Sequence, residues 1–171
     1  MINGNGVCEG VGVPRYGVPP GGVAVAWDSD RERHMGAWDS GPFDNDGAGD
    51  FCADLHDAKP ADRVGVLRDA LSAAADETDY LEIDVAQAAV AAVAVVAAQR
   101  PDGPPVDPDY GPGFLAEGDR LVIPDDLAPL ALRALNRVTG DDSEWRELWD
   151  EADALDEALA TLVPLRAALA G

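Results

Sequence analysis

The chain has 171 residues, 47% hydrophobic and 6% aromatic, which fits one domain with a core built mainly of small side chains. It holds 33 acidic and 12 basic residues, a formal net charge of −21. Nucleic acids and anionic membrane surfaces attract Lys- and Arg-rich proteins, so this charge argues against both as partners. A basic protein or a divalent cation suits the charge, while solubility or adaptation to high salt explains it without any partner.

Residues 1–34 differ in composition from the rest of the chain. They are rich in Gly, Pro and Val, have no helical period, and contain four acidic residues and three arginines. We interpret them as a flexible N-terminal extension, and residues 35–171, with 29 acidic and nine basic residues, as an acidic helical domain. No secretory signal is recognised, and Cys8 and Cys52 make no disulfide framework, so we expect a reduced, cytoplasmic protein.

Three helices are predicted in the first half of the domain. Asp44, Asn45 and Asp46 are candidate N-caps for a helix that ends near residue 57. A second helix starts at residue 61 or 62. The third, at about 83–100, is apolar on nearly every side, so we expect it to lie at the centre. Its apolar run is shorter than the roughly 20 residues of a membrane span, which favours a buried helix.

The second half begins with a predicted loop and ends with two helices. Residues 101–124 contain six prolines and four glycines, which predicts a long surface loop. A helix follows from about residue 125 and ends at Gly140. The last helix starts at 142 or 143 and carries a leucine every seven residues, until Pro164 breaks or kinks it. The pattern predicts an all-α bundle of about five helices.

The sequence lacks the motifs of the best-marked enzyme classes, among them GxSxG, Walker A, HExxH and paired CxxC. We therefore predict no catalytic residues and no cofactor. Cys52 and His56 are four residues apart and share a predicted helical face, where they could bind metal or form a thiolate–imidazole couple. A buried thiol beside a partly exposed imidazole is the interpretation that we favour.

Two tryptophans mark the last helix. Trp145 and Trp149 are one helical turn apart, with Leu148 beside them. Exposed together they would form a binding ridge, since Trp is enriched at interface hot spots. Packing of the helix against the core is the alternative that we favour.

The stretch 35–46, MGAWDSGPFDND, resembles the N-terminus of the bacterial family of unknown function numbered 4259, whose members open with MGxWGxGPFDND. The resemblance continues through residues 48, 50–51, 80–82, 134–138, 143–144 and 148–149, so that it spans about 35–171. Asp39 stands where the family usually has Gly, and Gly47 and Gly49 replace better helix formers. The family implies a small, acidic, helical, cytosolic domain and no catalytic residues.

The FDND motif has two interpretations. In the structural one, Trp38 and Phe43 anchor the loop, Pro42 sets its turn and residues 44–46 cap the first helix. In the functional one, a pre-organised acidic loop beside aromatic side chains presents carboxylates to a basic partner or a cation. The candidate binding residues are Trp38, Pro42, Phe43, Asp44, Asn45, Asp46, Trp145 and Trp149.

Three hypotheses about function follow. The first is a non-enzymatic protein-binding domain, of the immunity or inhibitor kind, whose acidic surface binds a basic protein. The second is a metal-dependent or enzymatic domain centred on Asp44, Asp46 and His56, for an unknown metal. The third is a salt-adapted domain without a specific partner, whose stability would rise steeply with KCl.

Overall fold

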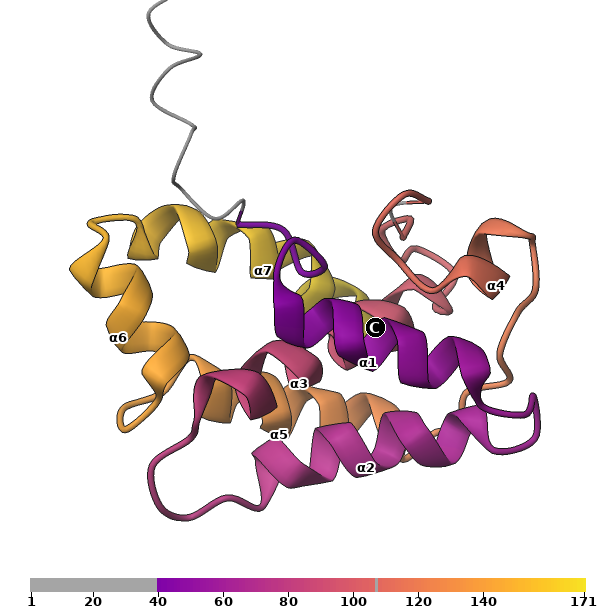
Figure 1. Ribbon diagram of the computed structural model, residues 1–171, viewed down its shortest axis with the longest axis horizontal. Helices are drawn as coiled ribbons and strands as arrows, with labels where there is room; N and C mark the ends of the chain where they lie inside the picture. The colour runs from indigo at the N-terminus through magenta and orange to yellow at the C-terminus, as the bar shows by residue number, and fades with distance from the viewer. Residues whose placement is uncertain (1–39, 107) are drawn as a thin grey trace, which may run out of the picture. The chain divides into compact units, whose positions relative to one another are not determined.

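The computed structural model describes residues 40–106 and 108–171. The predicted extension at 1–34 and the candidate residue Trp38 lie outside the described residues. Within them the chain forms seven helices and no strand, so the prediction of an all-α fold is confirmed (Figure 1). The helices are α1 (Asp46–Asp57), α2 (Arg63–Ala75), α3 (Ile83–Ala98), α4 (Gly113–Ala116), α5 (Leu127–Val138), α6 (Glu144–Glu151) and α7 (Leu155–Ala170).

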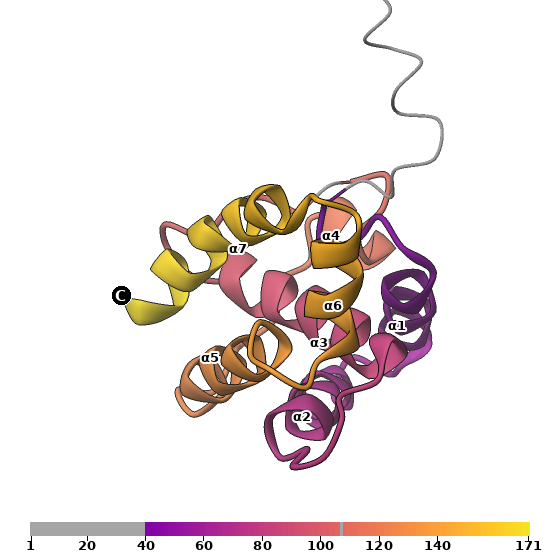
Figure 2. The same cartoon turned by 90° about the vertical axis from the view of Figure 1, so that its left-hand side faces the viewer.

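Helix α3 is the central helix, as its composition predicts. Eleven of its sixteen residues are buried, most of them Ala and Val. It packs against α1, α2, α5, α6 and α7, and Figure 2 shows these helices arranged around it. Small side chains on every face allow neighbouring helices to approach closely from several directions, and this explains how one helix can organise the bundle.

The C-terminal part of the chain forms two helices where one was predicted. Asp153, between α6 and α7, has a φ of 56°, a left-handed conformation that cannot continue a helix. The heptad leucines therefore do not form one stripe: Leu148 on α6 is 41% exposed, whereas Leu162 and Leu169 on α7 are buried. Pro164 does not break the helix, which continues to Ala170.

The long Pro- and Gly-rich loop at 101–124 is present but contains α4, a helix that the sequence did not predict. Phe114 on α4 is 2% exposed. This buried aromatic side chain, together with the partly buried Leu115 beside it, ties the middle of the loop to the bundle. Among the residues that the structure describes, no helix is long and apolar enough to cross a membrane.

A junction between distant segments joins the start of α3 to the start of α6. Leu81 and Ser143 form an isolated parallel β-bridge, in which Leu81 N–H donates to Asp142 O (2.9 Å) and Glu144 N–H donates to Leu81 O (3.0 Å). A carboxylate oxygen of Glu144 also accepts a hydrogen bond from Ile83 N–H at 2.7 Å. The first turn of α3 is therefore capped by α6 and not by its own N-cap side chain.

Candidate functional site

The FDND motif forms the turn that leads into α1. Asp44 N–H donates to Gly41 O at 3.3 Å and closes a turn over Pro42, which is half-buried, and Phe43, which is buried in the core. Of the three candidate N-caps, Asn45 makes the cap: its side-chain oxygen accepts a hydrogen bond from Ala48 N–H at 2.9 Å. The structural interpretation of the motif therefore accounts for Pro42, Phe43 and Asn45.

Replacing Asn45 with alanine is expected to lower the free energy of unfolding by about 1 kcal/mol, because Ala48 N–H loses its cap. Asn45→Ser keeps a capping oxygen and should recover most of the loss. Urea denaturation followed by circular dichroism measures both variants. Equal losses for alanine and serine would contradict a capping role.

The presence of glycine at position 47 is explained by a close contact with α3 that the sequence did not reveal. Its N–H donates to the side-chain oxygen of Gln87 at 3.2 Å, and a Cβ at this position would lie 2.6 Å from that oxygen. Gln87 on α3 is 5% exposed. The glycine that weakens the first turn of α1 by its propensity therefore leaves room for a buried amide that fixes α1 to α3.

A hollow of about 830 Å³ opens beside this turn. One wall comes from the FDND turn and the first turn of α1, and the other comes from the loop before α4, more than 50 residues further along the chain. The lining residues are Phe43, Asp44, Asn45, Asp46, Gly49, Asp50, Asp109 and Tyr110. Four carboxylates and two aromatic rings thus surround one concave surface.

Asp50, Asp109 and Tyr110 were not predicted as site residues. Asp50 is one turn after Asp46 on α1, so the helical period gives a signal for it. Asp109 and Tyr110 carry a weaker signal, an acidic–aromatic pair in a long loop, which is where binding residues often lie. Tyr110 is 60% exposed, so its ring is available to a ligand.

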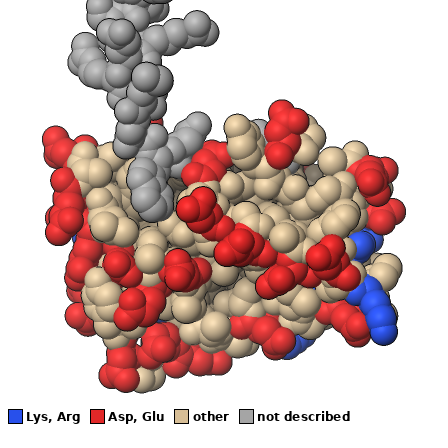
Figure 3. Space-filling view, viewed as in Figure 1, with Lys and Arg blue, Asp and Glu red and all other residues tan. Residues whose placement is uncertain are grey.

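The acidic character of the hollow continues along α1. Asp46, Asp50, Asp54 and Asp57 are exposed on the outer face of this helix, which contains no Lys or Arg. We call these four residues the α1 acidic stripe, and Figure 3 shows acidic side chains running across this face of the molecule. Such a face raises the local concentration of cationic partners.

Most arginines of the domain are engaged within the fold. Arg68 and Arg133 form ion pairs with Asp126 and Asp76. Four other arginines donate hydrogen bonds to carbonyl or side-chain oxygens: Arg63, Arg137, Arg146 and Arg166. The ion pairs of Arg63, Arg68 and Arg133 are made with Asp119, Asp126 and Asp76, none of which belongs to the α1 acidic stripe.

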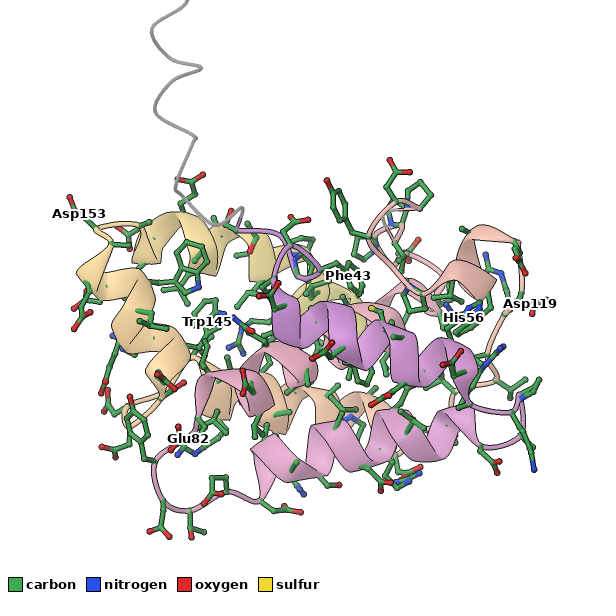
Figure 4. The ribbon with its side chains drawn as sticks, in the orientation of Figure 1. Phe43, His56, Glu82, Asp119, Trp145 and Asp153 are labelled. Atoms are coloured by element: carbon green, nitrogen blue, oxygen red, sulfur yellow. The ribbon has the colours of Figure 1, made fainter. Side chains whose placement is uncertain are left out.

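The structure argues against the two alternative sites considered from the sequence. These are the Cys52–His56 couple and the set of Asp44, Asp46 and His56. Burial raises the pKa of the Cys52 thiol to about 11, which argues against a thiolate–imidazole couple with His56. His56 is ten residues after Asp46 on α1, about 15 Å along the axis, and Figure 4 shows it far from Phe43 and close to Asp119. Within residues 40–106 and 108–171, no three His, Cys, Asp or Glu side chains are grouped to hold a metal ion.

Trp145 and Trp149, for which a binding ridge was the less favoured interpretation, do not line the hollow. Trp145 is 5% exposed and belongs to the core, and Trp149 is half-buried, with its ring centroid 6.1 Å from that of Trp145. The packing interpretation therefore describes Trp145, whose ring is not available to a partner. Of the eight candidate binding residues, the structure brings Phe43, Asp44, Asn45 and Asp46 together in the hollow.

The fold and the hollow define a class: a small, acidic, all-α domain with a concave surface lined by carboxylates and aromatic rings. The chain belongs to the family described as Domain of unknown function (DUF4259), whose model matches residues 36–161. This match includes both walls of the hollow. No curated protein and no solved structure matches the chain.

Proposed function

We propose that this protein is a non-enzymatic, cytoplasmic binding domain that recognises an arginine-bearing segment of a basic protein partner through the hollow beside α1. The observation that carries the proposal is the convergence of Asp44, Asp46, Asp50 and Asp109 with Phe43 and Tyr110 around one concave surface. An immunity or inhibitor role towards a basic toxin or nuclease is the specific form that this chemistry suits best.

The mixture of groups favours arginine over other cations. A guanidinium is planar, donates paired hydrogen bonds to carboxylates, and stacks on aromatic faces, so it can use both the carboxylates of the hollow and the exposed ring of Tyr110. A lysine ammonium is more strongly hydrated and gains less from contact with the Tyr110 ring. A divalent cation needs several oxygen ligands closely grouped around one point, and no such group is found in the described residues.

The rest of the surface supports recognition of an extended basic segment. The α1 acidic stripe leads away from the hollow, so further cations in the same segment can interact with Asp54 and Asp57. Exposed carboxylates of this kind contribute mainly to the association rate and are screened by salt. Side-chain specificity is therefore expected to come from the hollow, and long-range attraction from the stripe.

Replacing two hollow carboxylates, Asp46→Asn with Asp50→Asn, is expected to raise the Kd for an arginine-containing peptide at least about tenfold. The control, Asp54→Asn with Asp57→Asn, removes the same charge from the same helix outside the hollow and should change Kd less than about threefold. Fluorescence anisotropy with a short labelled Arg-Gly peptide and its Lys-Gly counterpart measures both, at about 50 and 150 mM salt.

The outcomes separate recognition of arginine from general charge attraction and from salt adaptation. Equal weakening by the two double variants, with equal affinity for both peptides, would reduce the interaction to general charge attraction. A domain that is stable at low salt and binds neither peptide would contradict the proposal. A domain that folds only at high KCl would favour salt adaptation instead.

A further inference from the structure

The wall of the hollow that carries Asp109 and Tyr110 belongs to a segment with little regular structure of its own. Residues 108–118 contain α4, whose four residues are too few for a helix to be stable alone. The backbone hydrogen bonds of this segment are local, as in Leu115 N–H to Pro112 O at 2.9 Å and Gly118 N–H to Leu115 O at 3.1 Å. Its position against α1 must therefore be set by side-chain packing.

Phe114 is the main anchor of this segment. Its ring is 2% exposed, and the guanidinium carbon of Arg63 lies 3.8 Å from the ring centroid. Gly113 packs against the His56 ring, because a Cβ at this position would be 3.3 Å from Nδ1. Between Phe114 and Tyr110 the chain runs through Gly111, Pro112 and Gly113, so the place of the Phe114 ring limits where Tyr110 can lie.

Arg63 fixes the other side of this contact. It is 8% exposed at the start of α2, donates a hydrogen bond to His56 O at 3.3 Å, and lies 3.9 Å from a carboxylate oxygen of Asp119. His56 belongs to the last turn of α1, the helix that forms the opposite wall of the hollow. The guanidinium thus connects α1 directly to the 108–118 segment, and a planar cation is needed to stack on Phe114 while donating in its own plane.

We propose that Arg63 and Phe114 are a positioning pair, which fixes the 108–118 segment against α1 and so holds Tyr110 at the hollow. The effect on ligand binding rests on the proposed function, whereas the placement of the segment does not. Arg63 is not expected to touch the ligand, because it is 8% exposed and its guanidinium faces Phe114, His56 O and Asp119 within the fold.

Amide hydrogen exchange of the full chain by NMR tests the pair. In Arg63→Met and in Phe114→Leu, which both leave an apolar side chain at the contact, the amides of Glu117, Gly118 and Asp119 should exchange at least about tenfold faster, while those of α3 change less than about twofold. Arg68→Met is the control, since it removes an exposed arginine of the same helix, paired with Asp126, and should leave the 108–118 segment unchanged.

Unchanged exchange of these amides in both variants would overturn the proposal, as would equally faster exchange throughout the bundle. The peptide assay adds a second reading: Arg63→Met should weaken the arginine peptide at least about threefold, and Arg63→Lys, which retains the charge, should not restore it. A wild-type protein that binds no peptide would refute the proposed function, and the exchange rates would still decide whether Arg63 and Phe114 position the segment.

Discussion

Replacing Trp145 with alanine is expected to lower the free energy of unfolding by about 3–5 kcal/mol, a large fraction of the total stability of an ordinary domain. The side chain is 5% exposed and lies on α6, which packs against α3 and α7. Removal of the indole leaves a cavity where these helices meet. Because α6 has eight residues and little intrinsic stability, it cannot compensate by itself.

Urea denaturation followed by far-UV circular dichroism measures this loss without using tryptophan fluorescence. Trp149→Ala is the matched control, one turn along the same helix and half-buried, and should cost about 1–2 kcal/mol. Trp145→Phe, which retains an aromatic ring, should fall between the two. A loss at Trp145 no larger than that at Trp149 would show that α6 does not dock by this face.

Replacing Arg137 with methionine is expected to cost about 2–3 kcal/mol. From α5 its guanidinium donates to Glu77 O (3.0 Å), Asp141 O (3.1 Å), Asp142 O (3.3 Å) and Asp79 O. These carbonyls belong to the α2–α3 and α5–α6 connections, which meet at the junction between Leu81 and Ser143. Loss of the guanidinium leaves the two connections joined mainly by the β-bridge.

Arg133→Met is the control for Arg137, since it lies one turn earlier on α5 and forms an ion pair with Asp76 in which both side chains are at least 60% exposed. An exposed pair of this kind contributes about 0.2–1 kcal/mol. Arg137→Lys should recover less than half of the loss, because one ammonium cannot reach carbonyls on two connections. Equal costs for the two arginines, measured by urea denaturation, would contradict the role of Arg137.

Helices and their order could be predicted because their signals are local. The apolar composition of α3 predicts its central place, and the proline and glycine content of 101–124 predicts a loop. The break at Asp153 could not be predicted, since an aspartate in a left-handed conformation has no obligatory sequence signal. The continuous leucine repeat instead suggested one helix across it.

Half of the candidate site could be found from the sequence, and the other half could not. Phe43 and residues 44–46 are contiguous, so the motif identified one wall of the hollow. Asp109 and Tyr110 reach the same hollow only because a loop is fastened by Phe114 and Arg63, a contact across about 50 residues. Packing between residues so far apart in the chain leaves no recognisable pattern in the local sequence. The same is true of the hydrogen bond between Gly47 and Gln87.

The most direct test of the proposed function is a map of backbone amide shifts in the full-length ¹⁵N-labelled protein, as the Arg-Gly peptide is added. We predict saturable shifts concentrated at residues 41–50 and 109–111, with smaller changes at Asp54 and Asp57 and none along α7. The Lys-Gly peptide should produce weaker shifts at the same residues. Shifts spread evenly over all acidic surfaces, or confined to residues remote from the hollow, would contradict recognition of arginine at this site.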